Sequence, residues 1–145
     1  MALVEKTVIV PYSAEQMFKL VDDVEDYATF LPWCGGASVD SLAGEVMHAT
    51  VRIDYHGVKQ SFSTRNVRSI PNRIDMKLLN GPFKQLDGEW LFVALSPTAC
   101  KIAFRLHYEF SSVLLGKLVG PVFHKIASSF VEAFIERAEK VYVTK

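Results

Sequence analysis

An apolar stripe with helical spacing runs through residues 113–143, and it constrains the fold more than any other part of the chain. Large apolar side chains recur there at steps of three and four, while charged side chains such as Lys117, Glu132 and Glu136 fill much of the other side. A single helix of this length would be about 46 Å long. Burying each large apolar side chain stabilises a fold by about 1.5 to 3 kcal/mol, so a second layer is expected to cover the stripe.

Pro121 interrupts this stripe. A proline inside a helix has no N–H to donate and clashes with an earlier carbonyl, at a cost of about 3 kcal/mol. Gly116 and Gly120 loosen the same turn. A helix could begin at Pro121, but the apolar spacing continues unbroken from Leu115 to Val119, so we expect a longer helix that is kinked at Pro121.

The chain ahead of this helix alternates with period two, which predicts antiparallel strands within residues 3–10, 37–55, 58–65, 74–78, 83–95 and 100–110. Ser13 and Gln16 form a capping box for a short helix after the first strand, and the segment from Asp22 to Leu31 predicts a second. An antiparallel sheet with one apolar face needs a cover. The sequence therefore predicts one α+β domain over residues 1–145, in which a curved antiparallel sheet wraps around a long C-terminal helix.

Composition argues against several classes of function. Cys34 and Cys100 are the only cysteines, and the four histidines are scattered, so neither a disulfide nor a metal site is expected. No apolar run of about 18 residues and no signal pattern is present, which predicts a cytoplasmic protein, either free or peripheral to the inner membrane.

Enzyme signatures are also missing: the sequence has no phosphate-binding glycine loop, GxSxG elbow or HExxH helix. We therefore expect a non-enzymatic protein with no required cofactor and no catalytic residues. An acid or base role for Tyr55, Tyr108 or His107 is the remote alternative, although alternation places His107 on the polar side of its strand.

Charge is distributed unevenly although the formal net charge is zero. Residues 1–50 hold eight acidic and two basic side chains, whereas residues 51–86 hold seven basic ones against Asp54 and Asp75. The candidate contacts to RNA phosphates or anionic lipids are Arg65, Arg68, Arg73, Lys77 and Lys84. A solvated sheet face is the alternative, and DNA is not expected as a partner.

Two large aromatic residues lie beside a break in the chain at residues 30–36. Pro32 ends any helix there, and Gly35 with Gly36 allows a sharp turn. The apolar residues Phe30, Leu31 and Trp33 either close one end of the core or form an entrance loop that touches a membrane.

Three segments together resemble a known family. They are VDDVEDY at residues 21–27 leading into FLPWC at 30–34, NGPFK at 80–84 followed by Trp90, and FVEAFIERA at 130–138. Over essentially the whole chain this pattern resembles the coenzyme Q-binding START-domain family, except that Ala28 stands where proline is usual. The resemblance implies the helix-grip fold, of START or Bet v 1 type, and an apolar tunnel that holds a lipid or a polyprenyl quinone.

Two functions follow as predictions. The first is a carrier for ubiquinone or a related isoprenoid lipid that supports respiratory electron transport. Its cavity is expected between the sheet and the helix, with a loose wall from Leu115 to Phe123 and a packed segment from Ile126 to Tyr142; a fully packed core is the alternative. The residues expected to line this cavity are Ile53, Tyr55, Phe62, Met76, Leu78, Trp90, Phe92, Phe104, Leu106, Leu118, Val122, Phe123 and Ile126.

The second function is implied by the resemblance, because the family includes a bacterial toxin that acts on ribosomes. It is binding to the large ribosomal subunit, with inhibition of subunit association and translation initiation. The basic segment of residues 51–86 is its independent support in this sequence.

Overall fold

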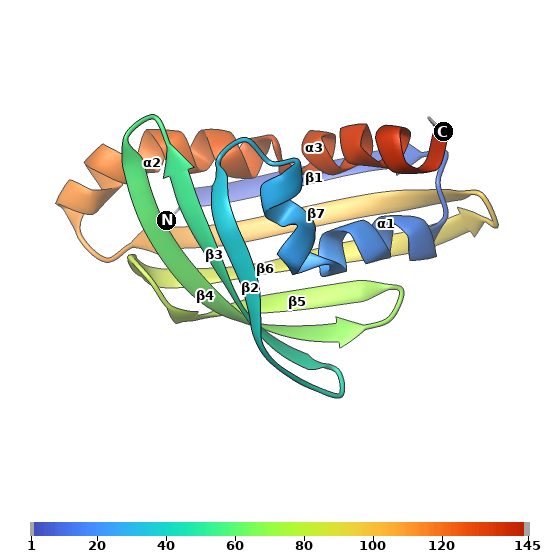
Figure 1. Ribbon diagram of the computed structural model, residues 1–145, viewed down its shortest axis with the longest axis horizontal. Helices are drawn as coiled ribbons and strands as arrows, with labels where there is room; N and C mark the ends of the chain where they lie inside the picture. Colours follow the sequence, from blue (N-terminus) through green and yellow to red (C-terminus); the bar gives the residue numbers. More distant parts are fainter. Residues whose placement is uncertain (1, 144–145) are drawn as a thin grey trace.

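The computed structural model describes residues 2–143 and shows a seven-stranded antiparallel sheet that curves around helices (Figure 1). Its strand order is β1-β7-β6-β5-β4-β3-β2, so the chain crosses from β1 to the far edge and returns strand by strand until β7 pairs with β1. The strands are β1 (Ala2–Val10), β2 (Cys34–Ala43), β3 (Val46–Tyr55), β4 (Val58–Ser69), β5 (Arg73–Asn80), β6 (Phe83–Ser96) and β7 (Ala99–Phe110).

Two short helices fill the crossover between β1 and β2, as predicted. They are α1 (Ala14–Asp22) and the 3₁₀-helix η1 (Val24–Thr29). The capping box of α1 is confirmed, because the Gln16 amide N–H donates to Ser13 Oγ at 3.1 Å and the Ser13 amide donates to Gln16 Oε1 at 2.9 Å.

The C-terminal helical region covers the concave face of the sheet. It consists of α2 (Val113–Ser128), α3 (Phe130–Ala138) and the short π-helix η2 (Glu139–Val143). Helix α1 packs on both α3 and β6. The ring of Phe18 on α1 meets the ring of Phe92 on β6 edge to face, with 5.7 Å between the ring centres. The predicted helix-grip architecture is therefore confirmed.

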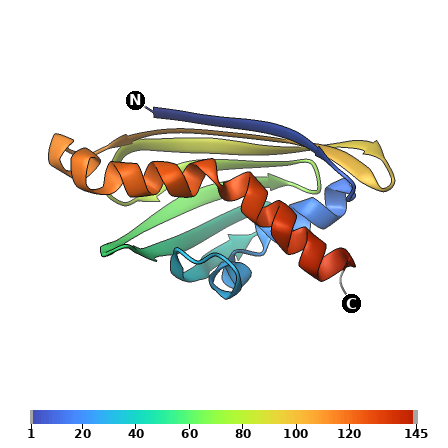
Figure 2. The same ribbon diagram turned by 90° about the horizontal axis from the view of Figure 1, so that it is seen from above.

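The helix continues through Pro121, as predicted. The break falls at Ser129, where α3 takes a new direction (Figure 2). Ser128 Oγ donates to the carbonyl of His124 at 2.7 Å, and Ser129 Oγ donates to that of Ile126 at 3.0 Å. Serine hydroxyls that bond to nearby helix carbonyls compete with the regular backbone pattern, which gives a local reason for the break.

The helix also divides into packed and exposed parts differently from the prediction. Val113, Leu114 and Leu118 at the start of α2 are exposed, whereas Phe123 and Phe134 farther along are buried. By length and composition alone, residues 113–143 are long and apolar enough to span a membrane. In the fold, 33% of the most apolar 18-residue stretch of this region is buried. A core helix of a soluble protein can pass the same test.

Candidate functional site

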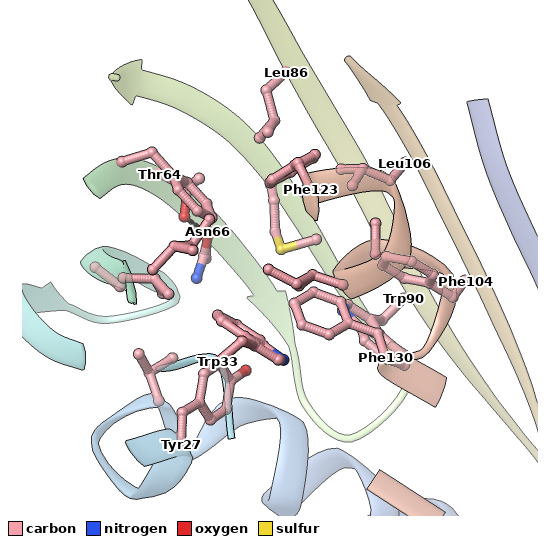
Figure 3. Close-up of a pocket in the computed structure, with 18 of the residues that line it drawn as sticks. Tyr27, Trp33, Thr64, Asn66, Leu86, Trp90, Phe104, Leu106, Phe123 and Phe130 are labelled. Atoms are coloured by element: carbon pink, nitrogen blue, oxygen red, sulfur yellow. Dashed lines mark hydrogen bonds between the residues drawn. The ribbon is translucent and has the colours of Figure 1, made fainter. Parts of the chain in front are cut away.

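A small apolar cavity lies between the concave face of the sheet and the α2–α3 region (Figure 3). Its volume is about 60 Å³. Most of the residues predicted to line a cavity do line it, namely Ile53, Phe62, Met76, Trp90, Phe104, Leu106, Phe123 and Ile126. Alternation along the strands and the buried stripe of the helix bring these side chains together.

The remaining five predicted residues lie elsewhere. Phe92 is fully buried between other core side chains, and Leu78 and Val122 are half-buried outside the cavity wall. Tyr55 lines an outer groove, and Leu118 is exposed to solvent on α2. On the helix, the apolar stripe holds more residues than one face can bury, so the sequence could not show that Leu118 and Val122 lie outside the cavity wall.

Two buried polar residues of β4 form one wall of the cavity, and the sequence prediction missed both. Thr64 Oγ1 donates to Asn66 Oδ1 at 2.8 Å, while Trp90, Phe104 and Phe130 form the opposite wall in Figure 3. The side-chain amide of Asn66 points into the cavity. The alternation that places Phe62 inward also places these two residues inward, so the signal was present in β4.

The cavity is too small for a ring-sized ligand in this conformation. An engineered apolar cavity of about 150 Å³ binds benzene, whereas this one has a volume of about 60 Å³. The interior is thus an apolar, nearly closed core with the polar side chains of Thr64 and Asn66 in its wall. A larger molecule could enter only if part of the wall moved.

An outer groove of about 280 Å³ adjoins the cavity. Trp33 and Ile126 belong to the walls of both spaces and so separate them. The other groove residues are Phe30, Pro32, Tyr55, Lys125, Ser129, Glu132, Ala133, Glu136, Arg137 and Lys140. The Arg137 guanidinium lies 5.0 Å from the ring centre of Phe30, which ties α3 to the loop after η1.

Membrane contact by this loop is contradicted by its burial. Leu31 is 1% exposed and Trp33 is 4% exposed. The Trp33 ring packs against Phe130, with 5.4 Å between ring centres. Leu31 and Trp33 therefore close the end of the core. Phe30 and Trp33 also line the outer groove.

Two of the five side chains that were predicted to contact phosphates are paired with carboxylates instead. Arg68 is buried on the inner face of β4, where its Nε and Nη2 donate to the Asp22 carboxylate at 2.6 and 2.7 Å. Arg73 lies on the outer face and binds both Asp75 and Glu89. Neither guanidinium is therefore free for a phosphate.

The other three predicted contacts are exposed. Lys84 approaches Glu109 at 3.7 Å, while Arg65 and Lys77 form no ion pair among residues 2–143. Arg65 stands directly opposite Lys77 on one neighbouring strand and opposite His48 on the other. Arg65 and Lys77 are like charges placed in register, which repel each other, although Lys77 also stands opposite Asp87 on β6. An anion beside these two side chains would reduce their repulsion.

The side chains considered for acid or base chemistry do not converge. Tyr108 is buried beside α2, with its hydroxyl 3.0 Å from His124 Nδ1, and burial raises the pKa of this tyrosine. His107 faces outward near Asp87, and Tyr55 lies in the outer groove. Cys34 and Cys100 are both buried and free.

Comparison of the sequence with known proteins identifies its relatives. The family model described as polyketide cyclase / dehydrase and lipid transport matches residues 10–135. Ribosome association toxin RatA of Escherichia coli (strain K12) is 43% identical over 98% of this chain and 90% of its own length. The mitochondrial coenzyme Q-binding protein COQ10 homolog B of Xenopus laevis is 27% identical, over 92% of this chain and 57% of that protein.

Solved structures share the fold at lower sequence identity. A START superfamily protein from Mycobacterium smegmatis has a TM-score of 0.81 at 22% identity, covering 96% of this chain and 98% of its own. The Zhui aromatase/cyclase from Streptomyces sp. R1128 also has a TM-score of 0.81, at 17% identity, covering 96% of this chain and 94% of its own. The sheet and the helices across it are thus a shared architecture.

Proposed function

Because this chain belongs to the polyketide cyclase / dehydrase and lipid transport family, we propose that it binds an apolar ligand between its sheet and its C-terminal helices. The ligand class that fits best is an isoprenoid quinone or a similar lipid. In this proposal the protein carries the ligand without transforming it.

The observation that supports this proposal is an apolar interior whose wall contains the polar residues Thr64 and Asn66, with the Asn66 amide pointing into the cavity. A hydrogen bond from such an amide contributes about 0.5 to 1.5 kcal/mol. A ligand carbonyl can accept this bond from Asn66 Nδ2, while the aromatic wall with Trp90 and Phe104 suits a flat ring. A quinone offers both a carbonyl oxygen and a ring.

Binding in this proposal requires a local opening. Trp33 and Ile126 separate the cavity from the outer groove, so their displacement joins the two spaces. Ile126 lies three residues before the helix break at Ser129, where the regular hydrogen-bond pattern is already interrupted. The groove then holds the isoprenoid tail while the ring occupies the enlarged cavity.

A fluorescence titration tests this proposal, because the chain has two tryptophans and both line the cavity. A soluble short-chain ubiquinone analogue is expected to quench them saturably. Lipid extracted from the purified protein is expected to contain a quinone or another isoprenoid lipid by mass spectrometry. If no such lipid is extracted and the analogue produces no saturable quenching, the proposal is wrong.

The Asn66→Leu variant tests the polar contact specifically. Loss of one hydrogen bond is expected to weaken quinone binding roughly fivefold to tenfold. Thr50→Val on the outer face of β3 is the matched control, and it should leave binding unchanged. If Asn66→Leu binds the analogue as tightly as the natural protein, Asn66 is not a ligand contact.

A second candidate function is association with ribosomes, and we infer it from two observations. Relatives such as the 43% identical Escherichia coli protein carry the name ribosome association toxin. Arg65 and Lys77 stand in register on the outer face, away from the cavity, and RNA phosphates are suitable anions for this pair.

Sedimentation with large ribosomal subunits at several salt concentrations tests this candidate. The double change Arg65→Gln and Lys77→Gln is expected to weaken binding and to reduce the slope of log affinity against log salt by about 1 to 2. Lys101→Gln, which removes one positive charge from the exposed side of β7, is the control for the loss of a charge elsewhere. Failure of the natural protein to sediment with large subunits at low salt would exclude this function.

A further inference from the structure

The solvent side of α2 is unusually apolar for an exposed helix face. Val113 is 78% exposed, Leu114 66% and Leu118 64%. Pro121 on the same side is also exposed, while Val119 and Phe123 point into the core. Exposed apolar side chains grouped in this way mark an interaction surface more often than scattered ones do.

The charges on this face are all positive. Lys117 and Lys125 are exposed on α2, and no acidic residue occurs between Glu109 and Glu132. Glu109 itself lies 3.7 Å from Lys84 and is balanced by it. The face is therefore complementary to an anionic surface, in contrast to α3, which carries Glu132 and Glu136.

Its position suits contact with a flat surface. The first turn of α2 forms one end of the molecule and extends past the neighbouring strand ends, whereas the β6–β7 hairpin forms the opposite end (Figures 1 and 2). Farther along α2, Lys125 belongs to the wall of the outer groove. The exposed face and the mouth of the groove are therefore continuous along one helix.

We propose that the exposed face of α2, formed by Val113, Leu114, Lys117, Leu118, Pro121 and Lys125, docks on an anionic lipid bilayer. Helices that combine apolar side chains with lysines lie in the headgroup region of such membranes. Docking there would place the groove beside the lipid from which an apolar ligand comes. This role rests on the proposed ligand binding, but the surface itself can be tested without a ligand.

Vesicle sedimentation tests the proposal. The protein is expected to bind vesicles of phosphatidylcholine with phosphatidylglycerol more tightly than vesicles of phosphatidylcholine alone. The double change Leu114→Ser and Leu118→Ser should weaken binding roughly tenfold or more, because both side chains are already exposed and their apolar area is what the bilayer buries. Lys117→Gln should weaken binding to the anionic vesicles about fivefold.

The matched control replaces Val93 and Leu95 by serine, since these are exposed apolar residues of β6 near the opposite end of the molecule. It should bind vesicles as the natural protein does. The proposal is overturned if the natural protein does not bind anionic vesicles, or if the control loses as much binding as the α2 variant. It is also overturned if the α2 variant only converts a dimer into a monomer, which would make a second copy the occupant.

The soluble quinone analogue separates this inference from the proposed function. The Leu114→Ser and Leu118→Ser protein should retain quinone quenching while losing vesicle binding. If the natural protein binds vesicles but never binds the analogue, the ligand proposal fails and the docking surface stands.

Discussion

Arg68 and Asp22 form a bidentate ion pair between β4 and the last residue of α1. Their side chains are only 10% and 19% exposed, and the two residues are far apart in the sequence. A carboxylate at the C-terminal end of a helix is unfavourable by itself, because the helix dipole is negative there. The guanidinium compensates for this charge and joins the crossover helix to the sheet.

Arg68→Met should therefore lower the free energy of unfolding by about 3 to 5 kcal/mol, because it leaves Asp22 partly buried without its partner. Adding Asp22→Leu to this variant should restore most of the loss. Urea unfolding followed by tryptophan fluorescence measures both effects. A loss below about 1 kcal/mol in the single variant would mean that the pair has little structural role.

Tyr27 makes the stability of the fold sensitive to alkaline pH. Its hydroxyl donates to the carbonyl of Val21, and burial together with the charge of Asp22 raises the pKa of this tyrosine far above its ordinary value of 10.0. Burial also raises the pKa values of Cys34 and Cys100 from 9.0. All three groups stay protonated in the folded state at pH values where the unfolded chain loses their protons.

Stability should consequently fall as the pH rises. Below pH 9 both states hold these protons, so the contribution is fully present; above pH 9 to 10 the unfolded chain binds fewer protons, and the free energy of unfolding declines. Urea unfolding at increasing pH measures this slope. Tyr27→Phe should reduce the slope above pH 10, and an unchanged slope would assign the alkaline loss to other groups.

At the scale of elements, the C-terminal helix has two functions in its two parts. From Phe123 to Ala138 it supplies the buried side that closes the core, whereas its first two turns leave apolar side chains in solvent. The break at Ser129 separates α2 from α3, and both helices line the cavity, while α3 also packs on α1. Packing and exposure thus change along one continuous apolar stripe.

Truncations along the helix should follow this division. Phe134 is 1% exposed, so Phe134→Ala should lower the free energy of unfolding by about 3 to 5 kcal/mol. Leu118→Ala should change stability by less than about 0.5 kcal/mol, because its side chain is largely in water. Thermal or urea unfolding of the two variants provides the comparison. Equal losses would show that Leu118 is packed in solution.

At the scale of the whole molecule, the sheet and helices close on a cavity whose volume is about 60 Å³. Ala49 on β3 is buried in its wall. Its small side chain helps to keep the space open, since a larger side chain there would fill the void. In the ligand-binding proposal, the wall must open from this compact state.

Ala49→Val should separate stability from ligand binding. Two added methyl groups fill much of the void, so stability should stay the same or rise by about 1 kcal/mol, while quenching by the quinone analogue should weaken. Ala103→Val on the outer side of β7 is the control and should bind the analogue normally. Unaltered quinone binding by Ala49→Val would place the ligand outside this cavity.

The sequence by itself determined the elements and their order. Period-two alternation and helical spacing report which residues of one element share a face, and the capping box at Ser13 is a contact between residues three apart. Because these signals are local, strands, caps and the layered architecture followed from them. The same alternation, extended along β4, would also have placed Thr64 and Asn66 inside.

Only the tertiary structure decided which groups meet across long separations. The inward charge of Arg68 is accepted because Asp22 arrives from another element, and Leu118 faces solvent because the sheet covers only one side of α2. Helix α2 continues through Pro121, which local rules treat as the stronger interruption, and ends at Ser128, where two serine hydroxyls bond to helix carbonyls. Cavity volume and exposed surface depend on how packed layers fit together, and no local pattern of residues encodes that fit.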